Sequence, residues 1–137
     1  MAVIEQLDDA TFLARFENQS LSPIHFNHVG HLRLAWLYLA KWSTDEAIAR
    51  ICTGIQAYAT SLGAKDKFHC TVTVAIVQIM AVREAASETS SWQLFLAQNP
   101  DLVEDAIGVL TQYYSRELLF SDAARLALVE PDLQPVE

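Results

Sequence analysis

The sequence predicts an all-α fold, a single-domain bundle of about five or six helices. Three observations predict it. Apolar residues recur at the 3.6-residue period of a helix along most of the chain, as in Ile48, Ile51 and Ile55. The chain holds only 4 Gly and 4 Pro, and no Asn-Gly or Asp-Gly hairpin signal occurs. Apolar residues make up 52% of the 137 residues, which supplies a core without a disulfide or a metal.

The first two helices are predicted from their capping residues and their apolar spacing. A helix over residues 9–17 begins behind an aspartate cap. Residues 18–26 form a loop, because Pro23 disfavours the helical conformation in the residue before it. The second helix begins near Asn27 and continues to about Lys41. It is apolar nearly all round, which is typical of a helix buried in the middle of a bundle.

The third helix begins at Ser43 or Thr44 and ends at Gly63, a residue common just after a helix. The segment 68–86 carries a β-branched run over 72–77, which would suit a strand. Its length favours a buried helix instead. The prediction for this segment is therefore a fourth helix.

Three shorter helical segments are predicted in the C-terminal part. The first covers 90–98, the second extends over 100–114 with proline at its first position, and the third is a turn or short helix over 121–125. An extended tail over 129–137 contains two prolines. The whole chain, 1–137, is predicted to be one domain.

Charge and composition exclude several classes of protein. The chain has 17 Asp+Glu against 9 Lys+Arg, a net charge of -8, and its basic residues form no cluster. Nucleic acid and anionic membranes are therefore poor partners. Cys52 and Cys70 are too few for a disulfide framework, and the N-terminal residues do not resemble a signal peptide. No apolar stretch approaches the roughly 20 residues of a membrane span. We expect a cytoplasmic protein, either a monomer or a homodimer.

All four histidines lie in two short segments, His25-x-x-His28-x-x-His31 and His69. Because the second helix begins near Asn27, His28 and His31 belong to its first turn. Residues three apart share one side of a helix, so both project from the same face. His69 stands at the start of the fourth. The three can meet at one end of a bundle, whereas His25 lies in the preceding loop and is not part of the predicted site. Imidazole is a common ligand of divalent zinc, iron and nickel, so the spacing predicts a metal site with an open position.

Two alternatives stay open beside the metal site. The three histidines can line a pocket that binds a small molecule without metal or acts in acid–base chemistry, or they can be structural. In the site predictions Arg33 or Arg125 orients an anionic substrate, and Thr73 or Tyr114 donates a hydrogen bond to it.

The sequence also predicts partners for other side chains. Arginines in apolar surroundings need a counterion, and we expect internal ion pairs with Glu84, Glu130 or Asp132. Cys70 is expected to be a buried, unreactive thiol.

Five motifs carry a resemblance to a known family. They are Phe26-x-His28-x-x-His31-Leu32-Arg33-x-Ala35-Trp36, Lys67-Phe68-His69-x-Thr71-x-Thr73, Tyr113-Tyr114-Ser115, Ala124-Arg125 and Val129-Glu130-Pro131-Asp132-Leu133-x-Pro135. The chain resembles a family of small bacterial proteins of uncharacterised function. The resemblance implies one shared site built from His28, His31 and His69. Members carry Lys-Tyr-His-Glu-Thr where this chain has Cys70 in place of the glutamate.

Together these observations predict a protein with a histidine-lined pocket that binds or acts on a small molecule, with a divalent metal as one way of using it. If it is an enzyme, metal-assisted hydrolysis or oxidation of a small molecule suits an open three-histidine site. The alternative is a non-catalytic module that binds a small ligand or another protein.

Overall fold

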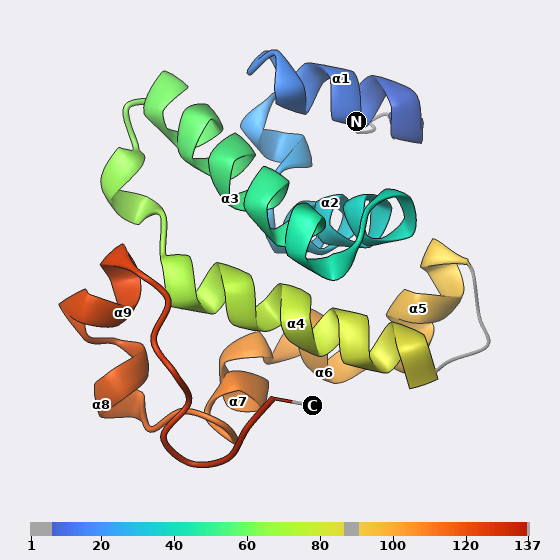
Figure 1. Cartoon of the computed structure of the whole chain (residues 1–137). Coiled ribbons are helices and arrows are strands. Elements are labelled where there is room, and N and C mark those ends of the chain that lie inside the picture. The colour runs from blue at the N-terminus through green and yellow to red at the C-terminus, as the bar shows by residue number, and fades with distance from the viewer. Residues whose placement is uncertain (1–6, 87–90, 137) are drawn as a thin grey trace.

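The computed structural model describes residues 7–86 and 91–136, and within them it contains helices, turns and loops but no β-strand. This confirms the predicted all-α fold. Figure 1 shows a bundle of two layers, with the long helix α4 between an N-terminal and a C-terminal group of helices. No described helix is both long enough and apolar enough to cross a membrane.

The N-terminal layer holds three helices and two single turns. Their bounds are α1 (Asp9–Glu17), η1 (Pro23–His25), α2 (His28–Lys41), α3 (Thr44–Ser61) and η2 (Lys65–Lys67). Each of the three α-helices is capped by a side chain that accepts a backbone N–H of the first turn. The capping residues are Asp8, Asn27 and Ser43. After α3, Gly63 has a φ of 70°, a left-handed conformation that glycine adopts at little cost. The predicted bounds of these helices are confirmed.

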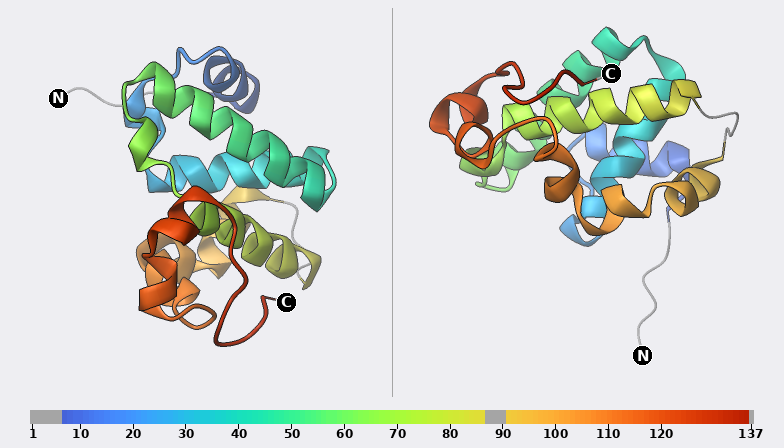
Figure 2. Two further views of the ribbon diagram at one scale, coloured as in Figure 1. Left: turned by 60° about the vertical axis from the view of Figure 1, so that its left-hand side comes forward. Right: turned by 90° about the horizontal axis from the view of Figure 1, so that it is seen from below.

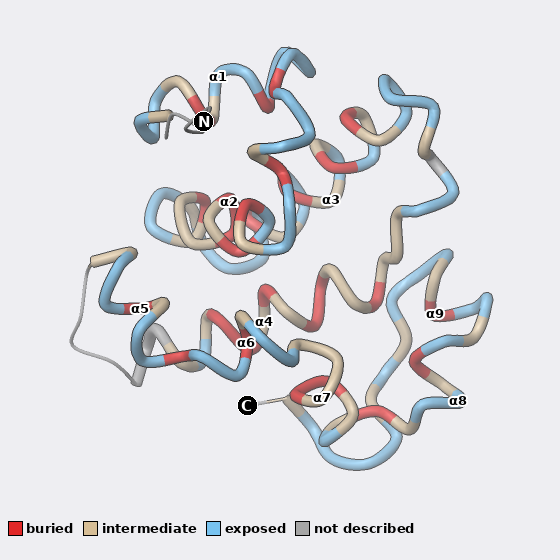
Figure 3. The backbone as a smooth tube through the Cα atoms, turned by 180° about the vertical axis from the view of Figure 1, so that it is seen from behind, coloured by how far each residue is buried: buried red, intermediate tan, exposed pale blue. Residues whose placement is uncertain are grey.

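Helix α4 (Cys70–Ala86) is the ambiguous β-branched segment, and it is helical. It packs against α2 and α3 on one side and against α7 and α9 on the other, an arrangement that both views of Figure 2 show. Figure 3 shows buried positions recurring along α2 and α4. The branched side chains of α4 are thus covered from both layers, and burial outweighs their modest preference for strands.

The C-terminal layer consists of five short helices. They are α5 (Trp92–Gln98), α6 (Pro100–Glu104), α7 (Ala106–Leu110), α8 (Arg116–Leu119) and α9 (Asp122–Leu126). The prediction of one helix over 100–114 is wrong, because the helix breaks at Asp105. There the backbone leaves the helical region (φ -149°, ψ 58°) and the carboxylate accepts the N–H of Gly108 to start α7. Helix α8 was not predicted.

The C-terminal tail is fixed to the bundle by side chains from two predicted motifs. The hydroxyl of Thr71, on α4, donates to the carbonyl of Ala127 (2.8 Å) and accepts the N–H of Val129 (3.1 Å). The hydroxyl of Tyr114 donates to the carbonyl of Val129, and Asp132 accepts the N–H of Ser115. These motifs hold the tail in an extended path against α4 and α7.

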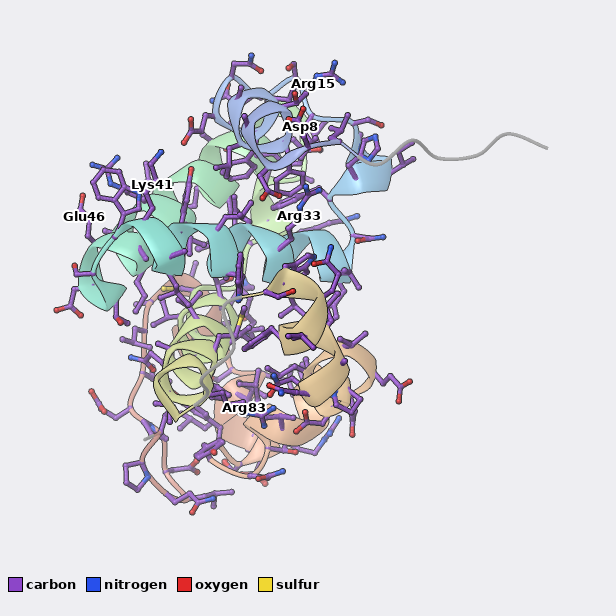
Figure 4. All side chains as sticks on the ribbon, turned by 90° about the vertical axis from the view of Figure 1, so that its right-hand side faces the viewer. Asp8, Arg15, Arg33, Lys41, Glu46 and Arg83 are labelled. Atoms are coloured by element: carbon purple, nitrogen blue, oxygen red, sulfur yellow. The ribbon has the colours of Figure 1, made fainter. Side chains whose placement is uncertain are left out.

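Arg33 and Arg83 form ion pairs within the chain, but neither pairs with Glu130 or Asp132. The side chain of Glu84, the third predicted partner, lies outside the described part of the structure. Arg33 pairs with Asp9 (2.8 Å) and also donates to the carbonyl of Leu7. Arg83 pairs with Asp101 through two hydrogen bonds of 2.8 Å. Figure 4 shows the two arginines in different layers, Arg33 on the side of α2 toward α1. Both acids lie in the first turn of a helix, where a carboxylate also complements the helix dipole.

Candidate functional site

The feature of greatest chemical interest is a cavity of about 400 Å³ between α2, α3, η2 and the first half of α4. Its volume falls in the range of sites for small molecules. The lining residues are Phe26, Asn27, His28, His31, Leu32, Ala35, Ile51, Ile55, Lys67, Phe68, His69, Val72, Thr73, Ile76 and Val77. His28, His31, His69 and Thr73 were predicted site residues, and the fold brings all four to one cavity. We call this the histidine cavity.

His28 and His31 reach the cavity from the first turn of α2. The Nε2 atom of His28 lies 2.7 Å from the carbonyl oxygen of Leu102, on α6. Because a carbonyl only accepts, this nitrogen carries a proton. By the same reasoning Nδ1 of His31, 2.9 Å from the carbonyl of Asn27, is protonated. In the neutral rings, Nδ1 of His28 and Nε2 of His31 therefore keep a lone pair.

The imidazole of His31 stacks on the ring of Phe26, with centroids 3.9 Å apart. Removal from water disfavours the charged form, and this burial lowers the pKa of His31 below its ordinary value of 6.5. The nearby His28 lowers it further, whereas the hydrogen bond to Asn27 acts in the opposite direction. The lowered pKa favours the neutral imidazole at neutral pH, although His31 keeps contact with solvent, and its ring lines the cavity with one acceptor nitrogen.

His69 has a different role, because both of its ring nitrogens are already used. Nδ1 accepts the N–H of Val72 (3.1 Å), three residues ahead, which makes His69 the N-cap of α4. Nε2 donates to the carbonyl of Leu119, on α8 (2.8 Å). The ring therefore starts one helix and fastens another, and only its faces and edges are available to a ligand.

Thr73 and Lys67 complete the polar part of the lining. Thr73 lies one turn beyond His69 on α4, and its hydroxyl has no hydrogen-bond partner among the described residues. Lys67 ends η2, is exposed, and makes no ion pair within the described part of the chain. Lys67 and Thr73 therefore offer an ammonium group and a hydroxyl as donors, beside the amide of Asn27, whose Oδ1 accepts the N–H of Gly30.

The polar lining residues of the cavity are grouped near the helix starts, where the apolar Phe26, Phe68 and Val72 also lie. The polar ones are in the first turn of α2, in η2 and at the start of α4. Farther along the helices the lining is apolar, as at Ala35 on α2, Ile51 on α3 and Ile76 on α4. At 1.5 Å per residue, Ala35 lies about 10 Å beyond His28 along the helix axis. The cavity is thus amphipathic along its length.

A shared metal site does not follow from this arrangement. In residues 7–86 and 91–136 no group of three or more His, Cys, Asp or Glu side chains is placed to hold a metal ion. A metal held jointly by His28, His31 and His69 would require the His69 ring to give up one of its two hydrogen bonds. Metal binding stays a prediction from the sequence.

Three other predicted site residues lie outside the histidine cavity. Arg33 faces Asp9 and lines a separate hollow of about 360 Å³, together with His25. The hydroxyl of Tyr114 is used in the bond to Val129, and its side chain is buried. Arg125, on α9, does not line the cavity and has no ion pair in the described residues.

The sequence reasoning missed the apolar wall of the cavity. Ile51 and Ile55 belong to the periodic stripe of α3, which was read only as core. Periodicity marks both as inward-facing but does not distinguish a filled core from a hollow one. Lys67 was available to sequence reasoning, since it opens the motif that contains His69, Thr71 and Thr73.

The cysteines are consistent with packing roles. Burial raises the pKa of the Cys52 thiol to about 11, and it raises the pKa of Cys70 as well. A thiol with a raised pKa is protonated at neutral pH and a weak nucleophile. Neither cysteine lines the histidine cavity, so the chemistry of the cavity rests on the histidines, Thr73 and Lys67.

No protein-family model, curated protein or solved structure matches this chain.

Proposed function

We propose that the protein binds a small molecule in the histidine cavity, with the apolar part of the ligand between α2, α3 and α4 and a polar group at the starts of α2 and α4. The observation that carries the proposal is the convergence of His28, His31 and Thr73 on a cavity of about 400 Å³ whose lining is mostly apolar. Apolar pockets with a few converging polar groups are typical ligand sites.

The acceptor on His31 gives the proposal a chemical direction. Nε2 of His31 has no hydrogen-bond partner among the described residues, and on the neutral ring it can accept a hydrogen bond or a proton from a bound hydroxyl or acid. The site would then be able to orient a ligand by hydrogen bonding. Histidines with purely structural roles would instead have all their ring nitrogens engaged, as His69 does.

A neutral probe tests the proposal. We expect 1-octanol, titrated into ¹⁵N-labelled protein, to shift the amide resonances of α2, η2 and the first half of α4 in a saturable way. Ala35 is 2% exposed and lines the cavity, so Ala35→Leu would fill the space and abolish these shifts. Ala40→Leu, at an exposed position of the same helix, is the matched control and should bind as the parent does.

Three outcomes are informative. Saturable shifts that vanish in Ala35→Leu and persist in Ala40→Leu support the proposal. Shifts that are absent, or that survive in Ala35→Leu, contradict it. Zinc alone is titrated in parallel into protein without an affinity tag, because the histidine spacing predicts a metal site. Stoichiometric zinc uptake that is lost in both His28→Ala and His69→Ala would replace the ligand proposal by the metal one.

A further inference from the structure

We propose that the ligand is a carboxylate with an apolar body, and that its anionic group lies beside Lys67 and Thr73. This inference rests on the proposed function and adds the charge of the ligand to it. Three features support it: the charges around the histidine cavity, the two helices that begin there, and the apolar lining farther along those helices.

The charge of the lining runs against the charge of the chain. The protein has 17 Asp+Glu and 9 Lys+Arg. Among the residues that the structure describes, however, no carboxylate lines the histidine cavity, and Lys67 is its one charged lining residue. A smaller adjoining hollow of about 150 Å³ also includes Lys67 and no acidic residue. An anion therefore meets an attractive charge here, although the protein as a whole repels it.

The starts of α2 and α4 add to this attraction. Each helix presents the positive end of its dipole at its N-terminus, and α2 has 14 residues and α4 has 17. The chain places acidic residues in the first turn of its other two long helices, α1 and α3. The first turns of α2 and α4 contain none. Their positive ends are thus not offset by an acid of their own first turn.

The anionic group fits the α4 side of the cavity better than the α2 side. On α2, His28 and His31 keep lone pairs that would repel an anion. On the α4 side, both nitrogens of His69 are engaged, and Thr73 has a hydroxyl to donate. Lys67 and Thr73 therefore supply the donors, and the acceptors of α2 remain free for a hydroxyl group elsewhere on the ligand.

The apolar end sets the rest of the ligand. Leu32, Ala35 and Val77 lie beyond the polar turns and are at most 2% exposed. An extended aliphatic or aromatic body of about 10 Å matches the distance along α2 from the first turn to Ala35. Octanoate has both features and serves as the probe.

The test compares octanoate with 1-octanol and octylamine, which share its chain and differ in charge. By isothermal titration calorimetry at pH 7.5 and low salt, we expect octanoate to bind at least about fivefold more tightly than 1-octanol. Lys67→Met should bring octanoate to the affinity of 1-octanol, and Thr73→Val should weaken octanoate more than 1-octanol. Lys41→Met, at an exposed site at the far end of α2, removes the same charge elsewhere and should change neither.

Failure of this inference is distinguishable from failure of the proposed function. Equal binding of octanoate and 1-octanol, unchanged in Lys67→Met, overturns the charge assignment and leaves the cavity as a binding site. Tightest binding of octylamine also overturns it and reflects the net charge of -8. Binding of none of the three probes contradicts the proposed function itself.

Discussion

At the scale of single residues, the three histidines of the predicted site have three different settings. His69 uses both nitrogens to hold backbone groups, His28 uses one to reach α6, and His31 uses one within its own helix and stacks on Phe26. The regular spacing of the histidines therefore does not show that His69 has a structural role while His28 and His31 each keep one ring nitrogen for a ligand. Only the hydrogen-bond partners separate the two roles, and two of them, Leu102 on α6 and Leu119 on α8, are distant in the sequence.

The setting of His31 predicts a pH dependence of stability. Because burial lowers its folded-state pKa below 6.5, the unfolded chain binds the proton more readily. His31 therefore contributes full stability above about pH 6.5, and this contribution is lost as the pH falls toward the lowered value. Urea unfolding between pH 7.5 and 5 should give a smaller loss of unfolding free energy in His31→Gln than in the parent. Parallel curves would show that His31 is not the group concerned.

The setting of His69 predicts a structural cost. His69→Ala removes the N-cap of α4, worth about 1 kcal/mol, and the bond to Leu119, worth a further 1 kcal/mol or so. We expect urea unfolding to show a loss of about 2 kcal/mol. Asparagine can cap a helix but is too short to replace the second bond, so His69→Asn should lose about half as much. Equal stability of all three proteins would exclude the capping role.

At the scale of elements, α4 organises the molecule. It lies between the two layers, its first residues line the histidine cavity, and Thr71 in its first turn binds the tail. The first turn of α4 thus contacts the tail through Thr71 and lines the cavity with Val72 and Thr73. Thr71 is fully buried, and its hydroxyl bridges the carbonyl of Ala127 and the N–H of Val129.

This contact predicts the effect of an isosteric change. Thr71→Val keeps the volume but leaves the carbonyl of Ala127 and the N–H of Val129 without their partner. Each unsatisfied group costs about 1–3 kcal/mol, so we expect a loss of about 2–3 kcal/mol in unfolding free energy and faster amide exchange at Val129. Thr71→Ser retains the hydroxyl and should lose less. A Val variant as stable as the Ser variant would contradict the contact.

The helix bounds show which elements could be predicted from the sequence. Capping residues and apolar period placed α1 to α4 correctly, because both signals are local. The break at Asp105 escaped the prediction because Pro100 and the apolar residues after it suit one continuous helix as well as two. Asp105 starts a new helix through its own carboxylate, a local competition that propensity does not resolve.

At the scale of the whole molecule, the candidate site was predictable in part. The placement of histidines at helix starts anticipated that His28, His31 and His69 would come together, and Thr73 with them. Arg33 and Tyr114 were misplaced because their partners, Asp9 and Val129, are distant in sequence. The apolar wall of the histidine cavity escaped prediction, since an apolar stripe looks the same whether its neighbours fill the space or leave it open.

The central claim is that an amphipathic small molecule binds in the histidine cavity. Isotope-filtered NOE measurements on the octanoate complex test this claim most directly. The account predicts contacts from the terminal methyl group to Ala35, Ile51 and Ile76. It also predicts contacts from the methylene next to the carboxylate to Thr73. Contacts confined to the exposed apolar residues of α8 and α9, such as Phe120 and Leu126, would contradict it.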